Sequence, residues 1–246
     1  MAKRQFGIST HLYHAQRLCR EHLLEIAAYG FECVELEAMP GHFDASNPAS
    51  VADLQQWLAE ARLELSAVAA PAPDSSAPWD AGSLAPVEHA LSVARRIPVK
   101  VLILPIGAPK SGSKAAERIA ALAEPLGVTV AIDSRSPSMA AIGSLLTFIE
   151  RCEAEVGIAL DFAAAARGGD LVDAIETASE HLVAARAPAE SAIDWASVMT
   201  TVLKVGYEGP LTIDVTGRGP AKDALSRAKS ARERMERWLA SGLLAD

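Results

Sequence analysis

The sequence has few cysteines and no long apolar run, and these two shortages exclude several classes of protein. Its three cysteines, Cys19, Cys33 and Cys152, lie far apart and show neither Cys-x-x-Cys nor Cys/His ligand spacing. A disulfide framework and a structural zinc site are therefore excluded, and we expect a reducing, cytoplasmic setting. The basic start of the chain continues into polar residues such as His11 and His14. We therefore expect neither a signal peptide nor a membrane span.

Positive charge is also scarce, because the formal net charge is -8 at neutral pH. A nucleic-acid footprint needs clustered lysine and arginine, so nucleic acid is excluded as a partner. The sequence contains no Gly-x-Ser-x-Gly elbow, no Walker loop and no Gly-x-Gly-x-x-Gly after a strand. The remaining partner is a small molecule, either neutral, cationic or a locally recruited anion.

The chain does contain short apolar runs that alternate with longer stretches of helical periodicity, a pattern typical of βα units around a parallel sheet. The pattern predicts strands at 6–9, 33–37, 65–69, 99–106, 129–133, 156–161, 182–187 and 211–215. It predicts helices at 21–29, 51–62, 84–96, 114–125, 139–151, 170–180, 194–204 and 221–239. Gly30, Gly127 and Gly206 follow three of these helices, where a left-handed cap is expected. We therefore predict an α/β fold, a single (β/α)8 TIM-barrel domain over residues 1–246.

Six segments occur in an order that is typical of one family of barrels. They are Gly7–His11, Ala28–Leu36, Gly127–Asp133, Val156–Asp161, Ala192–Trp195 and Val205–Asp214. Each falls at an expected strand end or helix start, and together they span nearly the whole chain. In these segments the sequence resembles the xylose-isomerase-like sugar isomerases and epimerases, of the apurinic-endonuclease type.

The resemblance implies a divalent metal at the C-terminal mouth of the barrel. In the family, a Glu after strand five, an Asp after strand six, a His after strand seven and a Glu after strand eight hold this metal. Only the second of these ligands is kept here, as Asp161, while Asp133 and Asp214 replace the two glutamates. Aspartate is one methylene shorter, and a misplaced catalytic group can cost about a hundredfold in rate.

Histidine is missing where the family has it. Ala164 replaces a histidine after strand six, and Arg186 and Pro188 align with the histidine positions after strand seven. His181 is predicted to end a helix, where interaction with the helix dipole is the expected role. We therefore expect a largely lost metal site and no cofactor; the alternative is a divalent cation bound by Asp133, Asp161 and Asp214 alone.

Arginines follow the same strand ends. Arg135, Arg186 and Arg218 come just after strands five, seven and eight. One interpretation is a set of salt bridges in which guanidinium groups replace the charge of the missing metal. The other is a pocket in which the arginines bind a carboxylate or a phosphate.

Glu37 ends the second strand and is a candidate general base, because a carboxylate above apolar side chains holds its proton more tightly. Glu35 has the same parity along the strand, so both side chains are expected on one face, although one of them could instead pair with an arginine at a helix surface. Trp79 can stack on a flat ligand, and His11, His14 and His42 could face the mouth, although hydrogen-bonded surface positions are the commoner case. The catalytic candidates are Glu37, Asp133 and Asp214; the ligand-binding candidates are His11, Trp79, Arg135, Asp161, Arg186 and Arg218.

Three functions fit these residues. The first is an inactive or repurposed barrel, natural or engineered, with a small-molecule pocket at its mouth. The second is a metal-dependent sugar isomerase or epimerase that uses Asp133, Asp161 and Asp214. The third is a metal-free enzyme, repurposed or designed, in which Glu37 or Asp133 abstracts a proton.

Overall fold

In the computed structural model, eight parallel strands form a closed barrel in sequence order, each paired with the next and β8 with β1. The structure describes residues 4–71, 81–106, 109–135, 141–215 and 220–242. The strands are β1 (Phe6–Ser9), β2 (Cys33–Glu37), β3 (Glu64–Ala69), β4 (Val101–Leu104), β5 (Thr129–Asp133), β6 (Val156–Asp161), β7 (Leu182–Pro188) and β8 (Leu211–Asp214). The predicted (β/α)8 barrel is confirmed.

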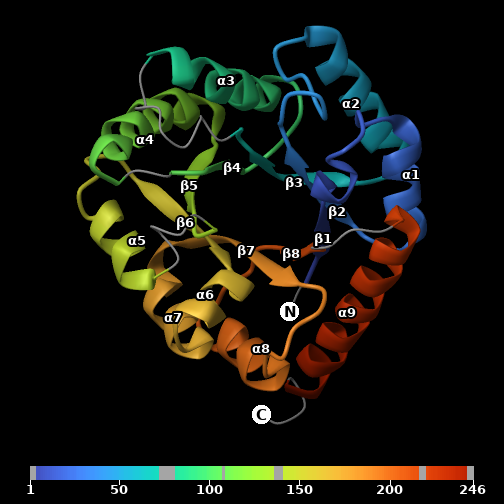
Figure 1. The fold of residues 1–246 in the computed structure, drawn as a ribbon, viewed down its shortest axis with the longest axis vertical. Coiled ribbons are helices and arrows are strands. Elements are labelled where there is room, and N and C mark those ends of the chain that lie inside the picture. Colours follow the sequence, from blue (N-terminus) through green and yellow to red (C-terminus); the bar gives the residue numbers. More distant parts are fainter. Residues whose placement is uncertain (1–3, 72–80, 107–108, 136–140, 216–219, 243–246) are drawn as a thin grey trace.

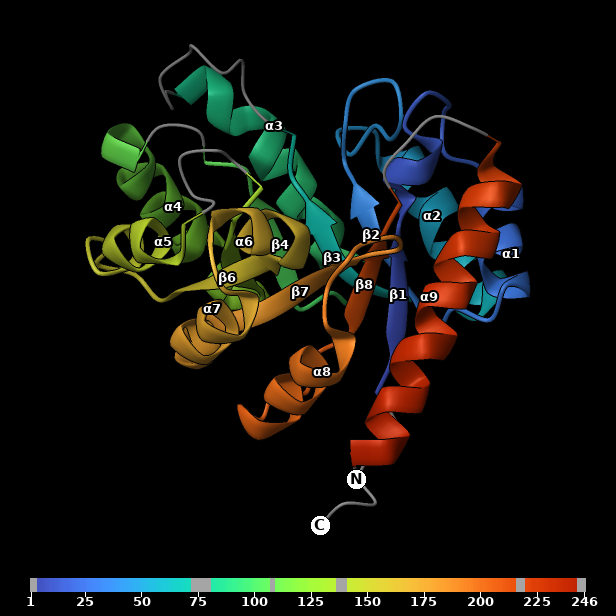
Figure 2. The same cartoon turned by 60° about the horizontal axis from the view of Figure 1, so that its bottom comes forward.

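The helices surround the strands as an outer ring (Figure 1). They are α1 (Arg20–Ala28), α2 (Pro48–Ala61), α3 (Ala81–Ser92), α4 (Pro109–Ala123), α5 (Ile142–Ile149), α6 (Phe162–Gly168), α7 (Leu171–Ala178), α8 (Trp195–Lys204) and α9 (Ala221–Gly242). Short 3-10 helices add η1 (Thr10–Tyr13), η2 (Val93–Arg95), η3 (Glu124–Leu126) and η4 (Ser179–His181). The long helix α9 runs beside β1 and α1 (Figure 2). Within the described residues, no helix combines the length and the apolar character that crossing a membrane requires.

The strands bury both of their faces, as strands in parallel barrels do. Val34 and Leu36 of β2 belong to the large apolar layer between strands and helices. Glu35 and Glu37 lie on the opposite face and contact arginines from the far side of the barrel. Both glutamates therefore share the inner face, as their period-two spacing predicts.

The interior of the barrel is apolar and built from small side chains in its lower part. Ala67, Ala131 and Ala159 pack there with Val101 and Ile103 in a cluster separate from the outer core. Toward the C-terminal ends of the strands, charged side chains occupy the interior.

Most predicted elements agree with the structure, and the helix ends confirm the predicted glycine caps. Gly30, Gly127 and Gly206 have φ values of +81°, +66° and +71°, a left-handed conformation that glycine adopts without steric cost. Strand β4 is shorter than predicted and ends before Pro105, which has no N–H group for the ladder. His181 ends η4 after a helix, as predicted.

Helix α6 was not predicted from the sequence. Only one helix was predicted between β6 and β7, yet α6 begins directly after β6 at Phe162. Asp161 caps it, because its Oδ1 accepts a hydrogen bond of 2.7 Å from the backbone N–H of Ala164. An aspartate followed by a run of alanines is a helix start signal, so this element was readable from the sequence.

Candidate functional site

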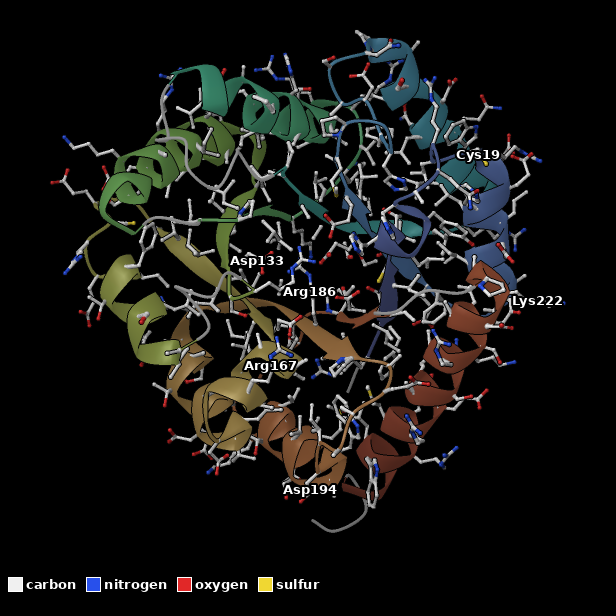
Figure 3. All side chains as sticks on the ribbon, in the orientation of Figure 1. Cys19, Asp133, Arg167, Arg186, Asp194 and Lys222 are labelled. Atoms are coloured by element: carbon white, nitrogen blue, oxygen red, sulfur yellow. The ribbon has the colours of Figure 1, made fainter. Side chains whose placement is uncertain are left out.

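The C-terminal mouth of the barrel collects carboxylates from strands that are far apart in the sequence. Glu37, Asp133, Asp161 and Asp214 end β2, β5, β6 and β8, and all four are buried. This end of a (β/α)8 barrel is where such enzymes place their chemistry. Figure 3 shows Asp133 close to Arg186 within the ring of strands, whereas Cys19, Asp194 and Lys222 lie among the outer helices.

Arg186 of β7 is the centre of this cluster, and its side chain is 0% exposed. Its Nε donates hydrogen bonds to both carboxylate oxygens of Glu35, at 2.8 and 3.0 Å. Its Nη1 lies 3.0 Å from Oδ2 of Asp133, an ion pair without hydrogen-bond alignment. Nη2 has no hydrogen-bond partner among the described residues. The guanidinium group thus joins β2 to β5 across the barrel.

Arg135 makes a second set of contacts from the loop after β5. Its Nε donates to Oδ2 of Asp133 at 2.9 Å, and its backbone N–H donates to Oδ1 at 2.9 Å. Nη1 and Nη2 each lie 3.3 Å from Oε1 of Glu37. Both oxygens of Asp133 are therefore occupied by arginine N–H groups. We call these five residues the central network: Glu35, Glu37, Asp133, Arg135 and Arg186.

The predicted salt-bridge set is therefore present around Asp133, with a member that sequence reasoning missed. From the sequence, Glu35 was considered only beside Glu37, and pairing with an arginine at a helix surface was one interpretation. Its side chain is instead 1% exposed and paired with Arg186. Its parity with Glu37 on the strand was the signal for a shared inward face. Its partner came from the opposite side of the barrel, which the sequence did not indicate.

Burial and charge move the proton affinities of the central network in opposite directions. Burial raises the pKa of Glu35 to about 7, although the neighbouring guanidinium of Arg186 acts against this change. Burial acts on Asp133 in the same sense, but Arg186 and Arg135 together hold the pKa of that carboxyl below its usual value. Asp133 is therefore a stable anion and a weak base.

Asp161 and Asp214 form the other part of the mouth and have fewer partners. Among the described residues no arginine forms an ion pair with Asp161, and its Oδ1 caps α6. Burial raises the pKa of Asp161, and the nearby charge of Asp214 acts in the same direction. Asp214 is 9% exposed, and its Oδ1 has no hydrogen-bond partner in the part of the chain that the structure describes. We call these two residues the aspartate pair.

A small cavity opens at the aspartate pair. Its volume is about 170 Å³, and it is lined by Arg135, Asp161, Ala163, Arg167, Pro188 and Asp214. Arg167 comes from α6, an element that was not predicted, and the residue was not a site candidate. Three predicted site residues, Arg135, Asp161 and Asp214, thus share one cavity.

The histidines of the first loops lie beside the mouth in a separate arrangement. His42 is 1% exposed, which corrects the expectation of a surface position. It is buried because its Nδ1 lies 2.8 Å from the carbonyl oxygen of Gln16 and its Nε2 lies 3.1 Å from Oγ1 of Thr10. The same Oγ1 accepts the backbone N–H of Glu37 at 3.0 Å. Thr10 and His42 therefore support the end of β2.

Within the described ranges, no hydrogen bond or ion pair joins His11 to the central network. Its ring stacks on that of His14 with centroids 4.7 Å apart, and its buried Nδ1 has no hydrogen-bond partner among the same residues. Two other ligand-binding candidates, Trp79 and Arg218, lie outside the described residues. Their roles stay predictions.

The donor set of the mouth does not fit a divalent metal. Asp133, which aligns with a family metal ligand, has both oxygens taken by Arg135 and Arg186. Among the described residues, no group of three or more His, Cys, Asp or Glu side chains is placed to hold a metal ion. Two guanidinium groups beside the site also repel a cation.

The closed ring of eight parallel strands, with polar side chains at their carboxyl ends, identifies the chain as a (β/α)8-barrel protein. Residues 23–241 match the family described as the xylose isomerase-like TIM barrel. The chain belongs to this family, as its sequence resemblance predicted. No curated protein matches the sequence.

Solved structures of similar fold include sugar epimerases. D-psicose 3-epimerase from Clostridium cellulolyticum H10, solved with D-tagatose, has a TM-score of 0.80 at 15% identity, covering 96% of this chain and 99% of its own. An L-ribulose 3-epimerase has a TM-score of 0.81 at 16% identity, covering 99% and 97%. A xylose isomerase domain protein from Planctomyces limnophilus has a TM-score of 0.76 at 16% identity, covering 98% and 100%. At these identities the likeness extends to the fold alone.

Proposed function

We propose that this barrel is a metal-independent member of its family that binds a small polar molecule at its mouth. One observation carries the proposal: both oxygens of Asp133 accept N–H groups of arginine, and Arg186 is wholly buried between Asp133 and Glu35. Removing a buried guanidinium from two carboxylates to admit a metal would leave charge unpaired, which is costly. The metal-dependent use of Asp133, Asp161 and Asp214 is therefore disfavoured.

The binding part of the proposal rests on the cavity at the aspartate pair. Asp214 is buried, yet its Oδ1 has no partner among the described residues, and a buried polar atom without a partner costs stability unless a ligand or water satisfies it. The three cysteines are free, which supports the further proposal of a reducing, cytoplasmic setting.

Metal titration tests the proposal directly. Chelator-treated protein is titrated with Mg²⁺, Mn²⁺, Co²⁺ and Zn²⁺ by isothermal calorimetry, and its thermal unfolding midpoint is followed in parallel. We expect no saturable binding and no shift of the midpoint.

The matched variants are Asp161→Asn and Asp214→Asn in the mouth and Asp223→Asn on the exposed start of α9. Stoichiometric binding of a divalent cation that disappears in both mouth variants and persists in Asp223→Asn would overturn the metal-independent reading. Weak binding that all three variants retain would be a surface effect and would leave the expectation intact.

A second candidate function is metal-free proton transfer by the aspartate pair. The observation that favours it is the difference between the two carboxyls: Asp161 has a raised pKa, and Asp214 has a free buried oxygen. One group can donate a proton while the other accepts one. Asp133, an earlier candidate base, is less suited because arginines lower its pKa, and Glu37 is held by Arg135.

Solvent exchange checks this candidate. Hydroxy-carbonyl compounds are incubated with the protein in D₂O, and deuterium at the carbon beside the carbonyl is measured by NMR. We expect incorporation that Asp161→Asn and Asp214→Asn each abolish and Asp223→Asn preserves. Incorporation that is equal in all variants would contradict catalysis at this pair.

A further inference from the structure

The mouth carries more negative than positive side chains, and the excess lies at one end. Its described carboxylates outnumber its described guanidinium groups; they are Glu35, Glu37, Asp133, Asp161 and Asp214 against Arg135, Arg167 and Arg186. Arg135 and Arg186 are both engaged in the central network. The aspartate pair therefore has no arginine within ion-pair distance among the described residues.

The aspartate pair also borders a cavity. Asp161 and Asp214 line the cavity of about 170 Å³, Asp214 is 9% exposed, and its Oδ1 is buried with no hydrogen-bond partner among the described residues. A buried carboxylate whose charge is not compensated attracts a cationic donor more than a neutral one, because opposite charges interact more strongly away from bulk water.

A second cavity lies along the outside of α6. Its volume is about 590 Å³, and Ala163 and Arg167 line both this cavity and the mouth cavity. Leu171 and Val198 give it an apolar wall. We call this second cavity the outer groove. Arg167 therefore borders both cavities.

The acidic residues of the outer groove already have hydrogen-bond or ion-pair partners. Asp170 caps α7 by accepting the backbone N–H of Val172, and Asp194 caps α8 in the same way. Oε1 of Glu190 lies 3.4 Å from Nε of Arg227. Of the carboxylates along the two cavities, the aspartate pair is thus the one whose charge is least compensated.

We propose that the mouth cavity binds the ammonium group of a small primary amine, held between Asp161 and Asp214. The ammonium offers three donors and one positive charge, which complement Oδ1 of Asp214 and the negative excess among the described residues. The remainder of the molecule lies toward Arg167. This inference rests on the proposed function, since a metal in the mouth would occupy the same carboxylates.

Three compounds with one carbon skeleton test the head group. Glucamine, sorbitol and gluconate are six-carbon open-chain polyols that end in an ammonium, a hydroxyl and a carboxylate. Isothermal calorimetry at neutral pH should give an affinity for glucamine at least tenfold higher than for sorbitol. Gluconate should bind more weakly than sorbitol, because its carboxylate would face the aspartate pair.

Variants locate the binding. Asp214→Asn keeps the size of the side chain and removes its charge, and it should lower the affinity for glucamine at least tenfold while sorbitol changes less than twofold. Asp223→Asn, on the exposed start of α9, should leave all affinities unchanged. Thermal unfolding checks that each variant is folded. If Asp214→Asn does not fold, Asp161→Asn serves as the second test.

Three results would overturn the inference: equal affinities for glucamine and sorbitol, tightest binding of gluconate with loss of that binding in Arg167→Gln, or no saturable binding of glucamine. The second result would assign the cavity to an anion instead. None of these results affects the metal titration, so a failure of the amine site and a failure of the metal-independent reading are distinguishable.

Discussion

The two parts of the barrel mouth differ in how their charges are compensated. In the central network, Asp133 contacts two guanidinium groups, and Glu35 receives two hydrogen bonds from Arg186. In the aspartate pair, Oδ1 of Asp161 accepts the backbone N–H of Ala164, and Oδ1 of Asp214 has no partner among the described residues. The carboxylates of both parts are buried toward the C-terminal ends of the strands.

This difference distinguishes the part of the mouth that stabilises the fold from the part that we propose binds a ligand. Nη1 and Nη2 of Arg186 make no hydrogen bond among the described residues, but its guanidinium group is paired with Glu35 and Asp133. Breaking these ion pairs to admit a ligand would leave a buried charge uncompensated. A buried carboxylate with an unused oxygen gains from a ligand that supplies a donor. The central network therefore places paired charges in the barrel interior, and the aspartate pair is the part that we propose binds a small molecule.

The largest effect is expected when the central network loses its central cation. Arg186→Met leaves Glu35 and Asp133 buried without this partner, and it should lower the free energy of unfolding by about 3–5 kcal/mol. Urea denaturation at neutral pH measures the change. Adding Glu35→Gln to Arg186→Met should recover part of the loss, since one of the two stranded charges is removed. A loss below about 1 kcal/mol would show that the network is not a structural unit.

A smaller, pH-dependent effect is expected in the aspartate pair. Burial raises the pKa of Asp161 in the folded protein, so the wild type has the full contribution of this group at low pH and loses it as the pH rises through the folded pKa. Asp161→Asn cannot ionise and keeps an acceptor for the N–H of Ala164. Its stability relative to the wild type should therefore increase by about 1 kcal/mol from acid to neutral pH.

Denaturation curves of both proteins across this pH range give the difference. A constant difference would mean that Asp161 is no harder to ionise in the folded protein than in the unfolded chain. Binding of an amine in the mouth cavity would then depend on the charge of Asp214 alone.

The smallest effect is expected at an ion pair outside the mouth. Nη2 of Arg118 lies 2.9 Å from Oε1 of Glu88, a distance as short as those in the central network, but the two side chains are 55% and 37% exposed. Arg118→Gln should change the free energy of unfolding by less than about 0.5 kcal/mol, because water already solvates both charges. Thermal denaturation measures it, and a loss comparable to that of Arg186→Met would mean that burial is not what distinguishes the network.

The elements that position the site followed from local patterns. Strands β2, β5 and β6 end at Glu37, Asp133 and Asp161, as predicted, because apolar runs and capping residues are short-range signals. Helix α6 was missed, although its capping aspartate and alanine run were readable, and Arg167 was missed with it. A set of salt bridges was predicted as one of two alternatives, and Asp133 does form ion pairs with Arg135 and Arg186. The other alternative, an anion pocket, stays a prediction.

The partners across the barrel depended on tertiary structure. Period-two alternation places Glu35 and Glu37 on one face of β2, and this depends only on the geometry of a strand. Which arginine each glutamate contacts depends on the closure of the barrel, which brings Arg186 to Glu35 across 151 positions of sequence and Arg135 to Glu37 across 98. The interior side chains below those contacts are small and apolar. Side-chain direction along a strand is a local property, whereas pairing and the compensation of buried charge arise only when the closed barrel excludes water.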